Sequence, residues 1–309
     1  MQNGTTDGGI YNSEAVKRSY IYHAAALLTA VIWGTTFVST KVLIVDGLMP
    51  QEVFFWRFAI AYIGIALFSL LSRSRLFADS LRDELMLAAG GVFGGSLYFM
   101  AENTALKYTL AGNVSILTAV APLFTALVAR MFYPSEKLRP ALLWGSVVAL
   151  LGVGLVVFNG NFILKLSPMG DILTLLAALC WAFYGSILRD IGNRYPTMFI
   201  TRKVFFYGLV TLIPFIIFGN SELHLRTFGK PAVAFNLLYL GMIASLACYF
   251  MWNSGLRAIG VVRASNYLYL VPLVTLITSA IVIGERVTPV AMLGAAFILA
   301  GVWMAGRRG

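Results

Sequence analysis

Residues 98–106 read YFMAENTAL and residues 249–256 read YFMWNSGL, so the chain contains nearly the same motif twice. Pro122 and Pro272 lie 150 residues apart, close to the offset between the two copies of this motif. A nearly constant offset along a chain indicates an internal repeat, in which each copy folds as one unit. The two halves are therefore predicted to share one arrangement of elements.

The limits of the two halves follow from the same comparison. Trp33 and Trp181 repeat at a distance of 148 residues, so the offset drifts only slightly along the chain. The predicted division is a cytoplasmic N-terminal tail (1–23), a first repeat (24–158), a linker (159–168) and a second repeat (169–307).

The composition indicates that the surface of this chain faces lipid. Of the 309 residues, 59% are hydrophobic and 12% are charged, whereas soluble domains have roughly 45–50% and about 25%. Apolar runs of about 20 residues recur, which is the length that crosses a hydrocarbon core about 30 Å thick. We therefore predict an all-α polytopic membrane protein with ten transmembrane helices, at 24–45, 51–71, 85–105, 111–132, 142–158, 169–188, 197–218, 237–256, 262–283 and 290–306.

The number of spans in each half fixes how the copies are related. Five spans are an odd number, so the second copy must enter the membrane from the opposite side, which makes an inverted repeat. Most Lys and Arg residues fall at one end of the spans, as Arg18, Arg75 and Arg189 do. Because cytoplasmic loops carry this excess of positive charge, both termini are predicted in the cytoplasm.

The net charge of +10 has the same explanation. No run of basic residues interleaved with aromatics suggests nucleic-acid binding. Cys180 and Cys248 both fall inside apolar spans, and no His, Cys or acidic cluster has metal-ligand spacing, so no disulfide, metal or cofactor is expected. The expected partners are a small-molecule substrate and the lipid bilayer, with no nucleic acid; assembly into a homodimer is left open.

Three charges are predicted inside the membrane near one edge. Lys41, Arg57 and Glu102 all fall within about 10 Å of the predicted outer ends of the first three spans. Buried charges in lipid usually pair or face a cavity, so Glu102 is expected to pair with Lys41 or Arg57. The group either locks the first three helices together, or forms a mouth that attracts carboxylates, or contains a Glu102 that titrates during transport. Arg202 aligns with Arg57 in the second half, where no acid matches Glu102.

Polar and aromatic side chains within the spans are candidates for a substrate pathway. Tyr98 and Glu102 share a helix face at a spacing of four, as do Tyr249 and Asn253. Aromatic residues in spans also serve packing or interface anchoring, and that alternative stays open. The candidates are Trp33, Lys41, Arg57, Tyr98, Glu102, Asn113, Trp181, Tyr184, Arg202, Tyr249, Asn253, Asn266 and Tyr267.

Each half also carries one proline near the middle of its fourth span. Pro122 and Pro272 each remove a backbone hydrogen bond and are predicted to kink the helix. In lipid a freed carbonyl is tolerated where it faces protein or a watery cavity. A plain packing kink would explain one such proline, and its recurrence in both halves favours a functional role.

The motifs resemble the EamA family of the drug/metabolite transporter superfamily. The resemblance rests on AVIWGTTFVSTK (30–41), on TLAGNVSILTAVAPLFTAL (109–127) followed by EKL and GSVVALLGVGLVV (145–157), and on their copies ALCWAFYGSIL (178–188) and VVRASNYLYLVPLVTLITSAIVIGERVTP (261–289). It implies a ten-helix secondary carrier that exports amino acids or other small metabolites across a bacterial inner membrane. The family's acidic residue after the fourth span corresponds to Glu136 and Glu285, the first in a less typical setting.

We therefore predict a secondary transporter that exports small metabolites such as amino acids by alternating access between two inverted halves. A nucleotide-binding loop is absent from the sequence, so ATP is not expected to drive it. An intramembrane enzyme would need paired acids or a histidine site within the spans, and the sequence offers neither. A non-transporting membrane receptor or scaffold is the alternative, against which the inverted halves argue.

Overall fold

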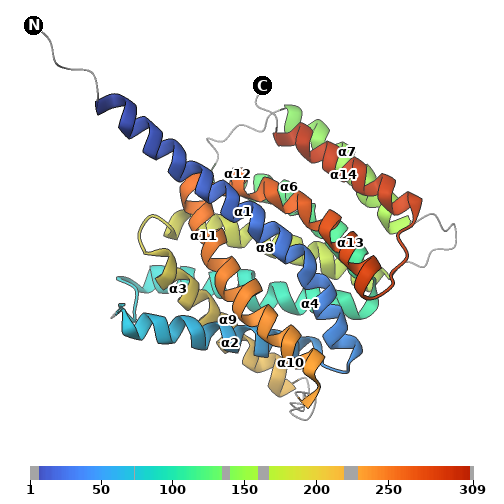
Figure 1. The fold of residues 1–309 in the computed structure, drawn as a ribbon, viewed down its shortest axis with the longest axis horizontal. Coiled ribbons are helices and arrows are strands. Elements are labelled where there is room, and N and C mark those ends of the chain that lie inside the picture. The colour runs from blue at the N-terminus through green and yellow to red at the C-terminus, as the bar shows by residue number, and fades with distance from the viewer. Residues whose placement is uncertain (1–6, 73, 134–139, 159–166, 219–228, 307–309) are drawn as a thin grey trace, which may run out of the picture.

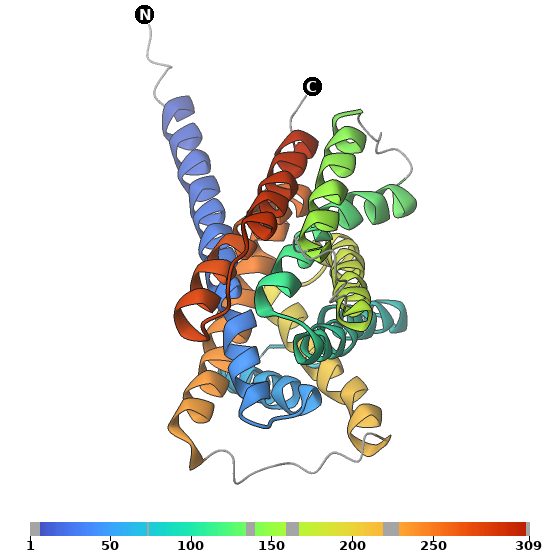
Figure 2. The ribbon, with the colours of Figure 1, turned by 90° about the vertical axis from the view of Figure 1, so that its right-hand side faces the viewer.

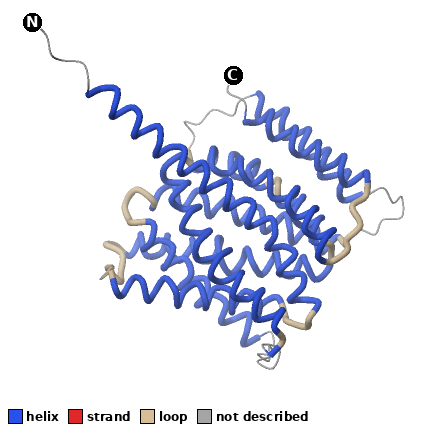
Figure 3. Tube along the Cα trace, in the orientation of Figure 1, coloured by secondary structure: helices blue, strands red, loops and turns tan. Residues whose placement is uncertain are grey.

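The computed structural model describes residues 7–72, 74–133, 140–158, 167–218 and 229–306. Within these ranges the chain forms helices and short connections, without any strand (Figure 3). The helices of the first half are α1 (Asp7–Val45), α2 (Pro50–Leu71), α3 (Leu81–Gly91), π-helical η1 (Val92–Ser96), α4 (Leu97–Tyr108), α5 (Ala111–Thr118), α6 (Ala121–Phe132) and α7 (Pro140–Phe158). Those of the second half are α8 (Pro168–Ile191), α9 (Thr197–Phe218), α10 (Pro231–Leu238), π-helical η3 (Tyr239–Ala247), α11 (Cys248–Ile259), α12 (Val261–Ser265), 3₁₀-helical η4 (Asn266–Leu270), α13 (Val271–Val282) and α14 (Pro289–Gly306).

Consecutive elements join into long apolar helices. In the described part of the chain, eight of them are long and apolar enough to cross a membrane, which confirms a multi-pass membrane protein. They span Tyr20–Val45, Pro50–Leu71, Leu81–Tyr108, Ala111–Phe132, Pro168–Ile191, Thr197–Ile217, Pro231–Ile259 and Arg263–Val282. The segments predicted at 142–158 and 290–306 correspond to α7 and α14.

Prolines mark where many of these helices begin. Pro50, Pro140, Pro168, Pro231 and Pro289 each occupy the first position of a helix. Proline fits there because its fixed φ is already helical and its missing N–H would have no partner in the first turn. At the N-terminus the helix extends further than predicted, since α1 begins at Asp7 and projects from the bundle (Figure 1).

The two predicted halves interleave in one bundle. α8 packs against α4 and α6, whereas α1 packs against α11 and α13, so each contact joins one half to the other. α9 likewise packs against both α2 and α3. The buried core is continuous across these contacts, from Trp33 and Phe58 of the first half to Trp181 and Tyr249 of the second. The centre of the bundle is therefore built by both halves.

α7 and α14 form a separate pair at one side of the bundle (Figures 1 and 2). Their backbones touch, because a Cβ built on Gly152 would lie 2.6 Å from the carbonyl oxygen of Gly294 and 2.7 Å from the amide nitrogen of Ile298. A second, smaller core of α5, α6, α7 and α14 residues, which includes Ala149 and Ile298, attaches this pair to the bundle. Glycine at this contact allows the close approach typical of helices in lipid.

Gly152→Ala is expected to destabilise the folded protein by roughly 1–3 kcal/mol, because the added methyl group must push the α14 backbone away. Gly154→Ala is the matched control on the same helix, since a Cβ there meets no atom within 4 Å. Alanine has the higher helix propensity, so the control should be neutral or slightly stabilising. Thermal unfolding of both purified variants in detergent measures the difference, and equal midpoints would contradict the close contact.

Candidate functional site

A cavity of about 40 Å³ lies in the centre of the bundle, where both halves contribute side chains. A buried water needs roughly 10–15 Å³ by the same measure, so the cavity has room for a few waters. Its lining comes from α1, α2, α4, α5, α6, α8, α11, η4 and α13: Trp33, Thr36, Phe37, Arg57, Tyr98, Phe99, Glu102, Ser115, Thr118, Ala119, Ala121, Trp181, Tyr249, Leu268 and Val271.

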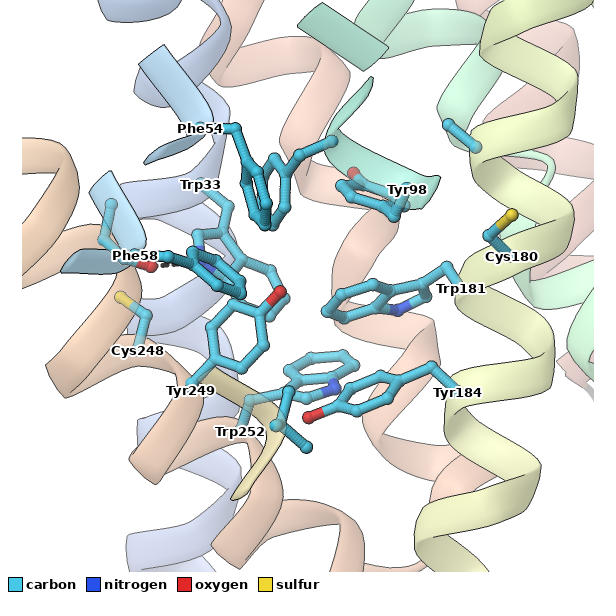
Figure 4. Packing of buried hydrophobic residues seen from close by; sticks show 14 of the residues in the cluster. Trp33, Phe54, Phe58, Tyr98, Cys180, Trp181, Tyr184, Cys248, Tyr249 and Trp252 are labelled. Carbon is cyan, nitrogen blue, oxygen red and sulfur yellow. Dashed lines mark hydrogen bonds between the residues drawn. The ribbon is translucent and has the colours of Figure 1, made fainter. Parts of the chain in front are cut away.

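Aromatic rings form much of the wall. The ring centroids of Trp33 and Trp181 lie 5.2 Å apart at an angle of 89°, and those of Tyr98 and Trp181 are also 5.2 Å apart. Tyr249 lies 6.0 Å from Trp33 and 6.1 Å from Trp181. These are favourable distances for aromatic pairs, and the labelled rings converge from α1, α4, α8 and α11 in Figure 4. The cluster gives the cavity an aromatic face.

Two of these rings are held by π-helical segments of the opposite half. Trp33 Nε1 donates to the carbonyl of Ala244 in η3 at 2.9 Å, and the Tyr249 hydroxyl donates to the carbonyl of Gly94 in η1 at 2.6 Å. A π-helical segment departs from the regular hydrogen-bond ladder of an α-helix, and such segments occur often at functional sites. Neither segment was predicted from the sequence; the glycine-rich run around Gly94 is the signal that could have indicated the first of them.

Arg57 brings a cationic group into the cavity. The residue is 3% exposed, its Nε donates to Ser245 Oγ at 2.6 Å, and its guanidinium lies 4.3 Å from the centre of the Phe99 ring. Among the described residues, the two terminal nitrogens of this guanidinium have no hydrogen-bond partner. Serine and phenylalanine thus hold the group in place while leaving its two-nitrogen end free to bind a carboxylate.

Glu102 brings the opposite charge to the same cavity. The residue is 5% exposed, and one carboxylate oxygen accepts a long hydrogen bond of 3.3 Å from the Tyr98 hydroxyl. The predicted ion pair of Glu102 with Lys41 or Arg57 is wrong, since neither pairing occurs in the described structure. Arg57 attracts Glu102 electrostatically without forming an ion pair with it. Both charges therefore remain available to a third group.

Lys41 lies outside the cavity for a clear physical reason. Its ammonium donates to the carbonyl of Leu106 at 2.5 Å and to that of Thr109 at 2.9 Å, at the end of α4. The last carbonyls of a helix have no partner within the helix and carry partial negative charge, so they attract a cation. Glu285 accepts from the first two amides of α5, Ala111 at 2.9 Å and Gly112 at 3.1 Å, and its charge attracts Lys41.

A hydrogen-bonded chain lies beside the aromatic cluster. The Tyr184 hydroxyl donates to Asn253 Oδ1 at 2.9 Å, and Asn253 Nδ2 donates to Thr201 Oγ1 at 2.9 Å. All three side chains are buried. Tyr184 and Asn253 are therefore next to the cavity and bonded to each other rather than part of its lining.

The other predicted pathway residues lie further away. Arg202 is buried and donates to Ser69 Oγ and to the carbonyl of Arg75, so it ties the start of α9 to the end of α2. The Asn113 amide donates to Thr109 Oγ1 at 3.3 Å. Asn266 is exposed, and Tyr267 forms a 2.9 Å hydrogen bond with His23.

Both prolines lie directly after an interruption of the fourth helix of each half. In the first half α5 ends at Thr118 and Pro122 is the second residue of α6. In the second half the 3₁₀ segment η4 ends at Leu270 and Pro272 is the second residue of α13. The interruptions border the cavity, since Ala119 and Leu268 both line it.

Small polar residues complete the lining, and they were not predicted from the sequence. Thr36, Ser115 and Thr118 line the cavity, but each also donates its hydroxyl to a backbone carbonyl within its own helix. Serine and threonine are common in membrane helices for this local bonding, so their type alone does not distinguish a lining residue. Phe99 was missed because an apolar ring offers no signal within an apolar span.

Comparison with known proteins agrees with this architecture. A relative from Streptantibioticus cattleyicolor, named as a probable terminal-alkyne amino-acid exporter, is 27% identical over 92% of this chain and 93% of its own. An Archaeoglobus fulgidus protein named as an uncharacterized transporter is 29% identical over 91% of this chain and 96% of its own. A Salmonella typhimurium protein named as a probable amino-acid metabolite efflux pump is 26% identical, over 90% and 92% respectively.

A solved crystal structure shares the fold, with a TM-score of 0.66 at 18% sequence identity over 92% of this chain and 96% of that one. Apolar helices around a charged central cavity, together with these relatives, define a membrane transporter. The profile of the EamA-like transporter family matches residues 21–158 and again residues 168–307. The chain belongs to the EamA-like transporter family, and the two matches fall on the two predicted halves.

Proposed function

We propose that this protein exports small metabolites such as amino acids by alternating access between two inverted five-helix halves. In this proposal α7 and α14 are the fifth and tenth transmembrane helices. Both termini lie in the cytoplasm, and the membrane is a bacterial inner membrane. The recurrence of a π-helical segment and of a proline after a helix interruption in both halves supports the repeat. The double match of the family profile supports it as well.

The observation that carries the proposal is that neither Arg57 nor Glu102 forms an ion pair with any residue that the structure describes. Both are more than nine-tenths buried, line one cavity and form no ion pair with each other. Isolated charges in a membrane interior are costly and usually mark a substrate or ion pathway. An amino acid would satisfy both, with its carboxylate on the Arg57 guanidinium and its ammonium on Glu102. The aromatic wall would receive its side chain.

The size of the cavity supports a conformational cycle. At about 40 Å³ it holds a few waters and not a metabolite. Binding therefore requires the walls to separate. The interruptions in the fourth helix of each half provide places where a helix can bend, because the backbone there lacks a continuous hydrogen-bond ladder. A site midway between two related halves is the arrangement that alternating access needs.

The direct test is transport by the purified protein in liposomes. Vesicles are loaded with single labelled amino acids, and their efflux is compared with that from protein-free vesicles and from vesicles that contain a variant with both cavity charges removed, Arg57→Gln with Glu102→Gln. Saturable efflux of at least one amino acid in the wild type, lost in the double variant, is the expected result. Binding of amino acids without movement across the membrane would favour a receptor and contradict the proposal.

Glu102→Gln is expected to flatten the dependence of transport on pH and to weaken amino-acid binding about tenfold. The neutral amide cannot exchange a proton or attract an ammonium group, and a charge-assisted hydrogen bond contributes about 1.5–3 kcal/mol. Efflux from liposomes at a series of pH values, with and without a pH gradient, measures both effects. A pH profile that matches the wild type would exclude Glu102 as a proton carrier.

A further inference from the structure

A second cavity, of about 530 Å³, lies where α8 and α11 end and α12 begins. Three arginines line it: Arg189 at the end of α8, Arg257 at the end of α11 and Arg263 near the start of α12. Gly260 joins α11 to α12 with a φ of 87°, a conformation that glycine adopts without strain. This turn lets Arg257 and Arg263 face the same space. We call this cavity the arginine vestibule.

Two of the three vestibule arginines have no acidic partner within the described part of the protein. Arg257 and Arg263 form no ion pair with any described acidic residue, and Arg189 lies 3.9 Å from the centre of the Tyr133 ring. Helix ends explain part of this pattern, because cations are stable near a helix C-terminus, as at Arg189 and Arg257. Arg263 lies in the short helix α12, which continues directly into the 3₁₀ segment η4.

The vestibule leads toward the central cavity. A narrow space of about 10 Å³ shares Arg257 with the vestibule and extends inward to Asn253. Asn253 is the middle of the chain Tyr184–Asn253–Thr201, which we call the latch. The Tyr184 ring lies 5.1 Å from that of Trp181, which lines the central cavity. Vestibule, latch and central cavity therefore follow one another along α8 and α11.

We propose that the arginine vestibule is a separate binding site for the carboxylate of a soluble substrate, occupied before the latch opens to the central cavity. The proposal rests on the function proposed above and adds a second site to it. Guanidinium groups bind carboxylates with two parallel hydrogen bonds, which suits this class of ligand. The positive charges of Arg257 and Arg263 in a recess also raise the local concentration of anions at the mouth of the path.

Chemical protection of the arginines tests this site without requiring transport. The wild-type protein in nanodiscs of phosphatidylcholine is treated with phenylglyoxal, which modifies accessible guanidinium groups, and the rate at each arginine is read by mass spectrometry. The probe is N-acetylglycine, a carboxylate without an ammonium group. Saturating probe is expected to slow modification of Arg257 and Arg263 about fivefold or more. Arg286, an exposed arginine outside both cavities, is the internal control and should react at an unchanged rate.

Two further arms separate this site from its alternatives. In Arg57→Gln, which removes the carboxylate partner of the central cavity, protection by N-acetylglycine should persist; its loss would mean that the central cavity causes the effect and would overturn the proposal. Nanodiscs that contain phosphatidylglycerol test for lipid. Protection by this anionic lipid with no N-acetylglycine present would assign the arginines to lipid headgroups and overturn a soluble ligand. Failure of amino-acid transport with intact protection would refute the proposed function alone.

Discussion

Arg57→Gln is expected to weaken amino-acid binding about 100-fold, the larger of the effects expected at the central cavity. The variant removes the charge and the two-nitrogen end of the guanidinium, which has no partner among the described residues and faces the cavity. Two hydrogen bonds to a charged carboxylate contribute about 3 kcal/mol in a buried site. Because each 1.4 kcal/mol changes a dissociation constant tenfold, this corresponds to about two orders of magnitude. Equilibrium binding of a transported amino acid to the purified variant measures the loss.

Two variants separate binding from stability. Arg57→Lys keeps the positive charge but loses the planar fork, so it should bind about tenfold more weakly than the wild type. Arg202→Gln is the matched control, because Arg202 is the buried arginine that aligns with Arg57 in the second half. It bonds Ser69 and Arg75 rather than facing the cavity. An equal loss of affinity in Arg57→Gln and Arg202→Gln would contradict a direct role for Arg57.

The all-helical, membrane-spanning character of the chain was predictable because the membrane imposes a length and a composition on each span. A helix that crosses lipid needs about 20 apolar residues, and the prolines at 50, 168 and 231 fix where helices can begin. The main departures lie where an apolar environment leaves more than one helical geometry open. η1 and η3 are π-helical within continuous apolar spans, and nothing in their hydrophobic pattern distinguishes them from α-helix.

The charged residues of the candidate site could be picked out from the sequence, but their partners could not. Arg57 and Glu102 stand out because charged residues are rare in spans, and both line the cavity. Lys41 is equally visible in the sequence, but the free carbonyls at the end of α4 hold its ammonium. These carbonyls lack helical partners only because α4 ends there, and they come within reach of Lys41 only when α4 packs near α1. Tertiary contacts of this kind have no periodic signal, so residue type alone could not assign partners to the three charges.

The strongest effect on stability is expected at the contact of α3 with α9, for Lys203→Met. Lys203 is 7% exposed at its side chain and pairs with Glu84, which is 20% exposed. Removing one member of a buried pair typically costs about 3–5 kcal/mol, because the remaining charge stays buried without compensation. We expect about 3 kcal/mol here, at the low end, since Glu84 keeps hydrogen bonds from the Tyr207 hydroxyl and from the Ala78 amide.

The control for this prediction is an ion pair that is exposed to solvent. Arg75 and Asp79 form an ion pair whose side chains are 49% and 69% exposed. Water screens such a pair, so Arg75→Gln should change the free energy of unfolding by less than about 1 kcal/mol. Thermal or denaturant unfolding of both purified variants in detergent gives the two changes in the free energy of unfolding that are compared. If Lys203→Met were no more destabilised than Arg75→Gln, Glu84 would have to find water or another cation in the variant. Lys203→Met combined with Glu84→Gln decides between these outcomes, because removing both charges should restore most of the lost stability only if the unpaired Glu84 is its cause.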